Sequence, residues 1–178
     1  STLFPSTTLF RSLWRYIAGE IGDEDVCAHR IANKLHCQAH EFGNSNRNFL
    51  AERMLISNDL LELAVGAIER WGEVRSSRYG RNDYWGSFLD ETSYADVHNK
   101  VGLRHVDSVR ILMDAVEAAV ISHAKSQSPW WLNNREKLAF NKEEALRYFA
   151  ILACTASPEA NLALIGRMLC EQEMLESS

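Results

Sequence analysis

The clearest pattern in the chain is a run of apolar residues at intervals of three and four between positions 105 and 125. Residues at this spacing share one face of an α-helix, so the run predicts an amphipathic helix with a buried face. The apolar set is Val109, Leu112, Met113, Val116, Ala119 and Val120, and the opposite face carries Asp107, Arg110, Asp114 and Glu117. We expect Leu112, Val116 and Val120 to be buried together. Asp107 and Asp114 are expected to pair with Arg110 on the solvent side.

Weaker forms of this pattern, together with capping residues and breaks, predict further helices. The expected ranges are 23–42, 47–56, 57–74, 93–101, a short helix that begins at Pro129, 141–155 and 158–176. Proline suits the first turn of a helix, because its missing N–H group has no partner there. Asn141 and Glu144 have the three-residue spacing of a capping box. Residues 76–104 contain three glycines among polar and aromatic residues, so we expect this segment to be irregular apart from its short helix.

The predicted fold class is all-α, because no segment shows the alternation of apolar and polar residues that favours a β-strand. Thr155–Ser157 allows only a tight turn, so the helices on either side should be antiparallel neighbours. Such helical hairpins form either an irregular bundle or an array of the helical-repeat type. If the chain is part of an array, an apolar surface along Leu164–Leu175 should be exposed and should make the protein self-associate.

The first twelve residues do not resemble the rest of the chain. Residues 2–12 read Thr-Leu-Phe-Pro-Ser-Thr-Thr-Leu-Phe-Arg-Ser, which resembles the translation of a common sequencing-library adapter. We interpret residues 1–12 as a non-native, disordered segment that the fold does not require. Residues 13–178 are then one helical domain or a fragment of a longer helical array.

Composition narrows the class of protein without identifying a function. The 178 residues are 46% hydrophobic and 24% charged, which is typical of a globular protein, and the formal net charge is −5. This acidic balance argues against general nucleic-acid binding. Cys27, Cys37, Cys154 and Cys170 fall inside predicted helices, which indicates reduced thiols in the cytoplasm. No apolar run approaches the roughly 20 residues of a membrane-spanning helix, so we expect no membrane association.

Three histidines in the predicted helix 23–42 come closest to a metal-binding pattern. His29, His36 and His40 share one side of the helix with Cys37 beside them, but they extend over about 16 Å along the axis. Only His36 and His40 are near enough to share an ion, and a structural zinc site needs four ligands. We favour a structural role for these residues and expect no cofactor, with His36 and His40 as the candidate ligands.

A metal-dependent hydrolase is a further alternative, suggested by His98, His105 and Asp107. Hydrolases of this type need an adjacent His-Asp pair on one helical turn, whereas Val106 separates His105 from Asp107 here. The chain also lacks a glycine-rich phosphate loop, a Gly-x-Ser-x-Gly elbow and a His-Glu-x-x-His motif. We therefore expect no enzymatic activity.

Arginines and aromatic residues alternate in one segment in a way that is typical of single-strand nucleic-acid grooves. Guanidinium groups pair with phosphates there, and rings stack on bases. The residues are Arg75, Arg78, Tyr79, Arg81, Tyr84 and Trp85. Because acidic residues follow at Asp83, Asp90 and Glu91, we favour a loop packed through its rings. Nucleic-acid binding by this segment is kept as an alternative function.

The remaining candidates are apolar residues that could contact a protein partner. Tryptophan is enriched at the centres of interfaces, but a Trp pair at a helix start more often packs into its neighbour. The candidate interface residues are Trp130, Trp131, Leu164, Met168 and Leu175.

Three stretches, residues 87–94, 130–136 and 146–169, resemble helical segments of large bacterial STAND-type NTPases. In that family an ATPase module is followed by a long helical region that senses a partner, and several members act in defence against phage. The resemblance covers about half of the chain and includes no catalytic motif. It implies a sensing or scaffolding segment, so our preferred prediction is a non-enzymatic helical scaffold that contacts another protein or another part of its parent chain.

Overall fold

The computed structural model describes residues 51–79, 88–98 and 108–171, and every regular element in these ranges is helical. The elements after a short helical stretch at 51–56 are α5 (Asn58–Tyr79), η1 (Leu89–Glu91), α6 (Tyr94–His98), α7 (Ser108–Lys125), α8 (Pro129–Ala139), α9 (Glu144–Ala156), η2 (Glu159–Asn161) and α10 (Leu162–Cys170). The predicted all-α class is confirmed. The predicted helix 23–42 and residues 1–12 lie outside the described ranges.

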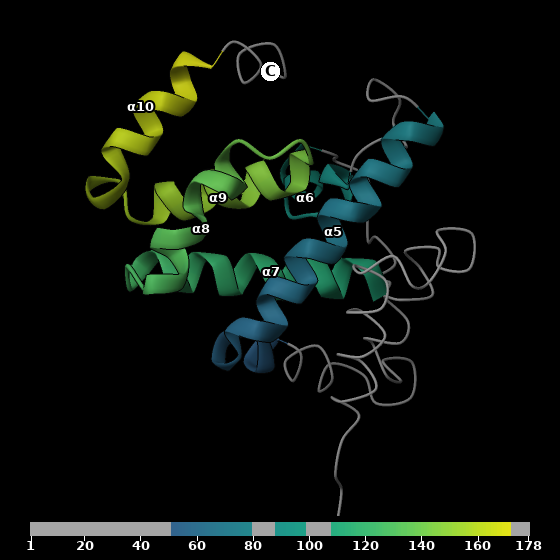
Figure 1. Ribbon diagram of the computed structural model, residues 1–178, viewed down its shortest axis with the longest axis horizontal. Coiled ribbons are helices and arrows are strands. Elements are labelled where there is room, and N and C mark those ends of the chain that lie inside the picture. The colour runs from purple at the N-terminus through teal and green to yellow at the C-terminus, as the bar shows by residue number, and fades with distance from the viewer. Residues whose placement is uncertain (1–50, 80–87, 99–107, 172–178) are drawn as a thin grey trace, which may run out of the picture.

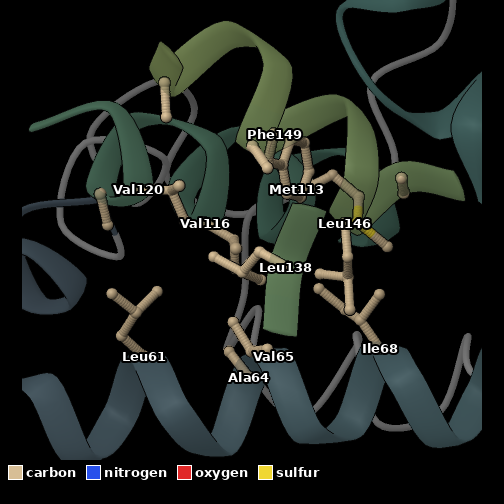
Figure 2. Packing of buried hydrophobic residues seen from close by; sticks show 14 of the residues in the cluster. Leu61, Ala64, Val65, Ile68, Met113, Val116, Val120, Leu138, Leu146 and Phe149 are labelled. Carbon is tan, nitrogen blue, oxygen red and sulfur yellow. The ribbon is translucent and has the colours of Figure 1, made fainter. Parts of the chain in front are cut away.

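The core lies where α5 crosses α7 and α9. Figure 1 shows α5 running obliquely to α7 and α9, which pack extensively on each other, and α10 at the edge of the described helices. In Figure 2, Leu61 and Ile68 of α5 point toward side chains of the other helices, among them Leu138 of α8 and Leu146 of α9. The predicted burial of Leu112, Val116 and Val120 is confirmed, because none of these side chains is exposed.

Ser128 ends one helix and begins the next. The N–H of Ser128 donates to the His123 carbonyl (3.0 Å) and the N–H of Gln127 to the Ala124 carbonyl (3.1 Å), the pattern of a Schellman motif. Gln127 has the left-handed φ of 47° that this motif requires, in a place where glycine is usual. The Ser128 hydroxyl then accepts the N–H of Trp131 (3.2 Å) as the N-cap of α8, with Pro129 in the first turn as predicted.

Several predicted boundaries differ from the structure. α5 continues to Tyr79, so residues 76–79 are helical rather than part of the irregular segment, and the short helix predicted at 93–101 is α6. The last helix ends at Cys170 instead of near residue 176, because Glu171 is extended. The start of α9 is capped by Glu143, whose carboxylate accepts the N–H of Ala145, so the predicted capping box was wrong about the capping residue.

The restart of the helix at Ser57 is confirmed. Residue 57 interrupts the helical stretch, and its hydroxyl accepts the N–H of Leu60 at 3.2 Å. This bond satisfies one of the N–H groups that a new helix leaves without a partner in its first turn. Across the parts of the chain that the structure describes, no helix has the length and apolarity needed to cross a membrane.

The burial of α7 gives a direct test of this packing. Val116→Asp should lower the free energy of unfolding by about 3–5 kcal/mol, because it places an unpaired charge in the core. Ala118→Asp is the matched control, since Ala118 is exposed on the same helix and should lose less than about 1 kcal/mol. Urea denaturation followed by circular dichroism measures both. Equal losses in the two variants would contradict the orientation of α7.

Candidate functional site

The turn between α8 and α9 is built by two buried polar side chains, Asn141 and Glu143. The Asn141 amide oxygen accepts the N–H of Glu143 (3.0 Å), a local bond that favours a turn over continued helix. The amide nitrogen donates to the carboxylate of Glu69 on α5 (3.0 Å) and to the Lys137 carbonyl (3.3 Å). Asn141 therefore fixes the turn and joins it to α5.

The Glu143 side chain is 5% exposed, which is unusual for a carboxylate. Its Oε1 atom accepts the buried N–H of Phe88 at 2.8 Å and the N–H of Ala145 at 3.4 Å. A carboxylate at the N-terminus of a helix is also favoured by the helix dipole, and Glu143 immediately precedes α9. These interactions hold residue 88, which is 55 positions away in the sequence, against the start of α9.

Gly72 allows Glu143 to take this position. A Cβ atom at residue 72 would lie 2.2 Å from Oε2 of Glu143 and 3.0 Å from its Cδ. Glycine in a helix interior costs up to about 1 kcal/mol relative to alanine. The close approach of the carboxylate accounts for glycine at this place in α5.

A cavity of about 390 Å³ opens beside Glu143, between α5, the end of α8 and the start of α9. Carboxylates outnumber basic groups in its lining, which includes Glu69, Glu73, Lys142 and Arg147. Lys137 reaches across from α8 to Glu69, with 3.3 Å between Nζ and Oε2. This arrangement can bind polar or cationic groups, but it places no nucleophile beside a base. We call this space the Glu143 cavity.

A second polar cluster joins α6, α7 and α9. The Ser93 hydroxyl lies 2.8 and 2.9 Å from the two carboxylate oxygens of Glu117, and 3.1 Å from the Tyr148 hydroxyl. Burial raises the pKa of Glu117, although its hydrogen bonds with Ser93 lower the pKa in part. The Tyr94 ring meets the Tyr148 ring edge-on, with 5.7 Å between centroids. The cluster fastens α6 to its neighbours.

Arg110 contributes to the same surface. It pairs with Asp114 one turn along α7 (2.8 Å) and with Asp96 of α6. Burial alone would lower the pKa of the Arg110 guanidinium, but its hydrogen bonds to Asp96 and Asp114 raise the pKa above its usual value. The predicted pairing of Arg110 with Asp114 is confirmed, the contact with Asp96 was not predicted, and Asp107 lies outside the described residues.

His123 joins the end of α7 to the start of α8. Its Nδ1 atom lies 2.7 Å from the Ser128 hydroxyl, and its ring lies against Trp130 with 5.0 Å between centroids. The Nε2 atom is buried and has no hydrogen-bond partner in the part of the chain that the structure describes. Burial lowers the pKa of the imidazole from its usual value of 6.5. This outweighs the end of a helix, which favours a positive charge.

The structure corrects the prediction that Trp130 and Trp131 form part of an interface. Trp130 is 5% exposed and Trp131 is not exposed, so both belong to the core. The indole N–H of Trp131 donates to the amide oxygen of Asn161 (3.0 Å), which ties α8 to η2. The pair packs inward, as Trp pairs at helix starts usually do.

The predicted apolar surface along the last helix is also corrected. Leu164 and Met168 are buried and attach α10 to the bundle. The exposed apolar side chains of α10 are Leu162 and Leu169 instead. Leu175 lies outside the described residues.

The remaining candidates cannot be placed as sites. His36 and His40 lie outside the described residues, as do Arg81, Tyr84 and Trp85. Arg75, Arg78 and Tyr79 belong to the last two turns of α5. Within the described ranges, no group of three His, Cys, Asp or Glu side chains could hold a metal ion. Nucleic-acid binding and metal-dependent hydrolysis therefore stay predictions.

Sequence reasoning missed Glu143, Gly72 and His123. The pair Glu143-Glu144 after Asn141 indicated a helix start, but a local pattern cannot show which carboxylate is buried. Glycine inside the otherwise helical segment 58–79 was the signal that could have been used, because an interior glycine often marks a close approach.

Comparison with known proteins gives no match: no family model, no curated protein and no solved structure is significantly similar to this chain. What the chain does is therefore inferred from its own side chains.

The contact between Gly72 and Glu143 predicts a change of sign in a double-mutant cycle. Gly72→Ala should destabilise the native protein by about 1–3 kcal/mol, because the new methyl group displaces the Glu143 carboxylate. Glu143→Ala should cost about 2–4 kcal/mol, because two N–H groups lose their acceptor. In the Glu143→Ala background, Gly72→Ala should stabilise by up to about 1 kcal/mol through helix propensity.

Gly166→Ala is the matched control for this cycle. A Cβ at residue 166 would meet no atom within 4 Å, so the substitution should stabilise α10 equally in both backgrounds. Chemical denaturation of the single and double variants gives the coupling free energy. A Gly72→Ala effect of the same sign and size in both backgrounds would show that Glu143 does not determine the need for glycine.

His123 predicts a pH dependence of stability. Because its pKa is lower in the folded protein, the unfolded chain binds the proton more tightly, and stability falls as the pH drops below about 6.5. The loss should continue until the pH reaches the folded-state pKa of His123. His123→Gln should lack this component, so the difference in unfolding free energy between the two proteins should change between neutral and mildly acidic pH. Parallel pH profiles would contradict the assignment.

Proposed function

We propose that this chain is a non-enzymatic helical scaffold that binds a protein partner through the outer face of α10. The outer face consists of Leu162, Gly166 and Leu169, which follow one another at intervals of four and three residues and so share one side of the helix. Leu162 is 66% exposed and Leu169 is 64% exposed. This exposure of large apolar side chains is the observation that carries the proposal.

The composition of α10 makes the exposure unusual. Arg167 is its only charged residue, whereas a helix on the surface of a globular protein normally has a polar outer side. Only Leu164 and Met168 are buried. Apolar residues remain on the solvent side, and exposed apolar patches of this kind are typical of protein interfaces.

The outer face is held in a defined place, which favours binding. The Arg167 guanidinium donates to Glu136 of α8 at 2.7 Å, and it lies over the Phe140 ring with 5.0 Å to the ring centroid. Together with Leu164 and Met168, these contacts orient Leu162 and Leu169 before any partner arrives. A preformed surface loses less conformational entropy on binding.

The expected partner presents an apolar side chain to the space beside Gly166. Nothing lies within 4 Å of the position that a Cβ would take there, so a neighbouring helix or loop can approach the backbone closely. A partner-binding scaffold also agrees with what the resemblance to the helical region of STAND-type NTPases implies. We propose a cytoplasmic location, which is consistent with the free thiols of Cys154 and Cys170.

Replacing the two exposed leucines tests this function. Leu162→Gln/Leu169→Gln should leave the melting temperature almost unchanged, because surface substitutions usually alter stability by less than about 0.5 kcal/mol. The native protein should bind an environment-sensitive apolar dye and should self-associate weakly in sedimentation experiments over a range of concentrations. The double variant should lose both properties.

Val97→Gln/Leu132→Gln provides the control, because it removes two exposed apolar side chains from α6 and α8. This protein should retain dye binding and self-association. The proposal is wrong if the native protein shows neither property, or if both double variants lose them to the same extent.

A further inference from the structure

A second cavity, of about 810 Å³, continues the Glu143 cavity along α5. The two cavities share Glu69, Glu73 and Lys137 in their linings, so they form one groove that the Glu69–Lys137 ion pair bridges. The groove follows α5 from Asp59 to Ser76, a length of about 25 Å at the helical rise per residue. We call it the α5–α8 groove.

The charge of the groove is unbalanced at one end. In the second cavity, carboxylates outnumber basic groups; the carboxylates are Asp59, Glu62, Glu69 and Glu73, and the basic residues are Arg70 and Lys137. Glu69 is already paired with Lys137. Asp59 and Glu62 are exposed, lie one turn apart, and form no ion pair within the described residues.

The helix dipole favours an acidic residue in the first turn, which accounts for Asp59 but not for Glu62. Two unpaired carboxylates one turn apart repel each other mildly, so a bound cation relieves this repulsion. The Lys137 ammonium at Glu69 shows that the groove accommodates a cationic side chain.

Trp130 provides an observation that is independent of charge. It lines the second cavity, it is 95% buried, and its indole N–H has no acceptor in the described part of the chain. A buried donor without a partner costs about 1–3 kcal/mol, and native proteins rarely leave one unsatisfied. Trp131, its neighbour, has the acceptor that Trp130 lacks.

We propose that the α5–α8 groove binds an extended peptide segment that carries lysine or arginine side chains. Its cationic groups pair with Asp59 and Glu62, its methylene chains and charges pack on the Trp130 ring, and its backbone carbonyls provide hydrogen-bond acceptors. A groove of this length holds about seven extended residues. This surface is separate from the outer face of α10, and its observations do not depend on that function.

The test uses two fluorescein-labelled heptapeptides, one alternating lysine with serine and the other alternating glutamate with serine. Fluorescence anisotropy should show that the full chain binds the lysine peptide, that added salt weakens the binding, and that the glutamate peptide does not bind. Asp59→Asn/Glu62→Gln should weaken the binding of the lysine peptide about tenfold, since it removes two charge pairs. Circular dichroism checks that the variant is folded.

Glu159→Gln/Glu171→Gln is the matched control, because it removes the same charge from two exposed positions outside the groove. Its affinity should stay within about twofold of that of the native chain, since surface charges beyond a Debye length are screened. In a nuclear magnetic resonance titration, the indole N–H signal of Trp130, assigned through Trp130→Phe, should shift while that of Trp131 stays in place.

Three results would each overturn the proposal: no binding of the lysine peptide, an equal loss of affinity in the two double variants, or an unshifted Trp130 signal. Loss of binding in Leu162→Gln/Leu169→Gln would instead locate the peptide on α10. Failure at the groove and failure at the outer face of α10 are therefore distinguishable.

Discussion

Removing a carboxylate from water is unfavourable unless hydrogen-bond donors replace the lost hydration, and at Glu143 these donors are the backbone N–H groups of Phe88 and Ala145. The carboxylate stays charged without lysine or arginine at the bond distances described, because the start of α9 and two N–H groups favour the negative form. Satisfying it brings three distant segments together, since Gly72, Phe88 and the α8–α9 turn must all approach one side chain. The position of α5 over the rest of the bundle follows from this requirement together with the apolar contacts of Figure 2.

Local patterns predicted the parts of the fold that depend on neighbouring residues. The spacing of Leu112, Val116 and Val120 identified the buried side of α7, and Ser128-Pro129 marked the start of α8. The same reasoning could not orient α10, because nearly all of its residues are apolar and a helix without a polar side has no pattern to assign. Leu164 and Met168 face the bundle while Leu162 and Leu169 face solvent, and only the positions of α8 and α9 decide between these alternatives.

The candidate sites were less predictable than the fold, for a related reason. Glu143 and Phe88 are 55 residues apart, and nothing in the sequence near either one indicates the other. The groove depends likewise on α5 and α8 lying side by side, with Lys137 reaching Glu69 and Asn141 donating to the same carboxylate. Acidic residues on α5 alone would indicate only a solvated face. Once α8 lies opposite, the same residues line a concave surface with a tryptophan in its wall.

The connection between α7 and α8 has no residue to spare. Ser128 donates its N–H to close α7, accepts the N–H of Trp131 to open α8, and contacts His123, while Gln127 alone supplies the left-handed turn. Since one residue serves both helices, an insertion or deletion here would assign these roles to different residues and rotate α8 by about 100° per position relative to α7. Trp130 and Trp131 would then leave the core. The length of this corner is therefore as strongly constrained as the identity of the side chains within it, and chain-length variation in this fold must be accommodated elsewhere.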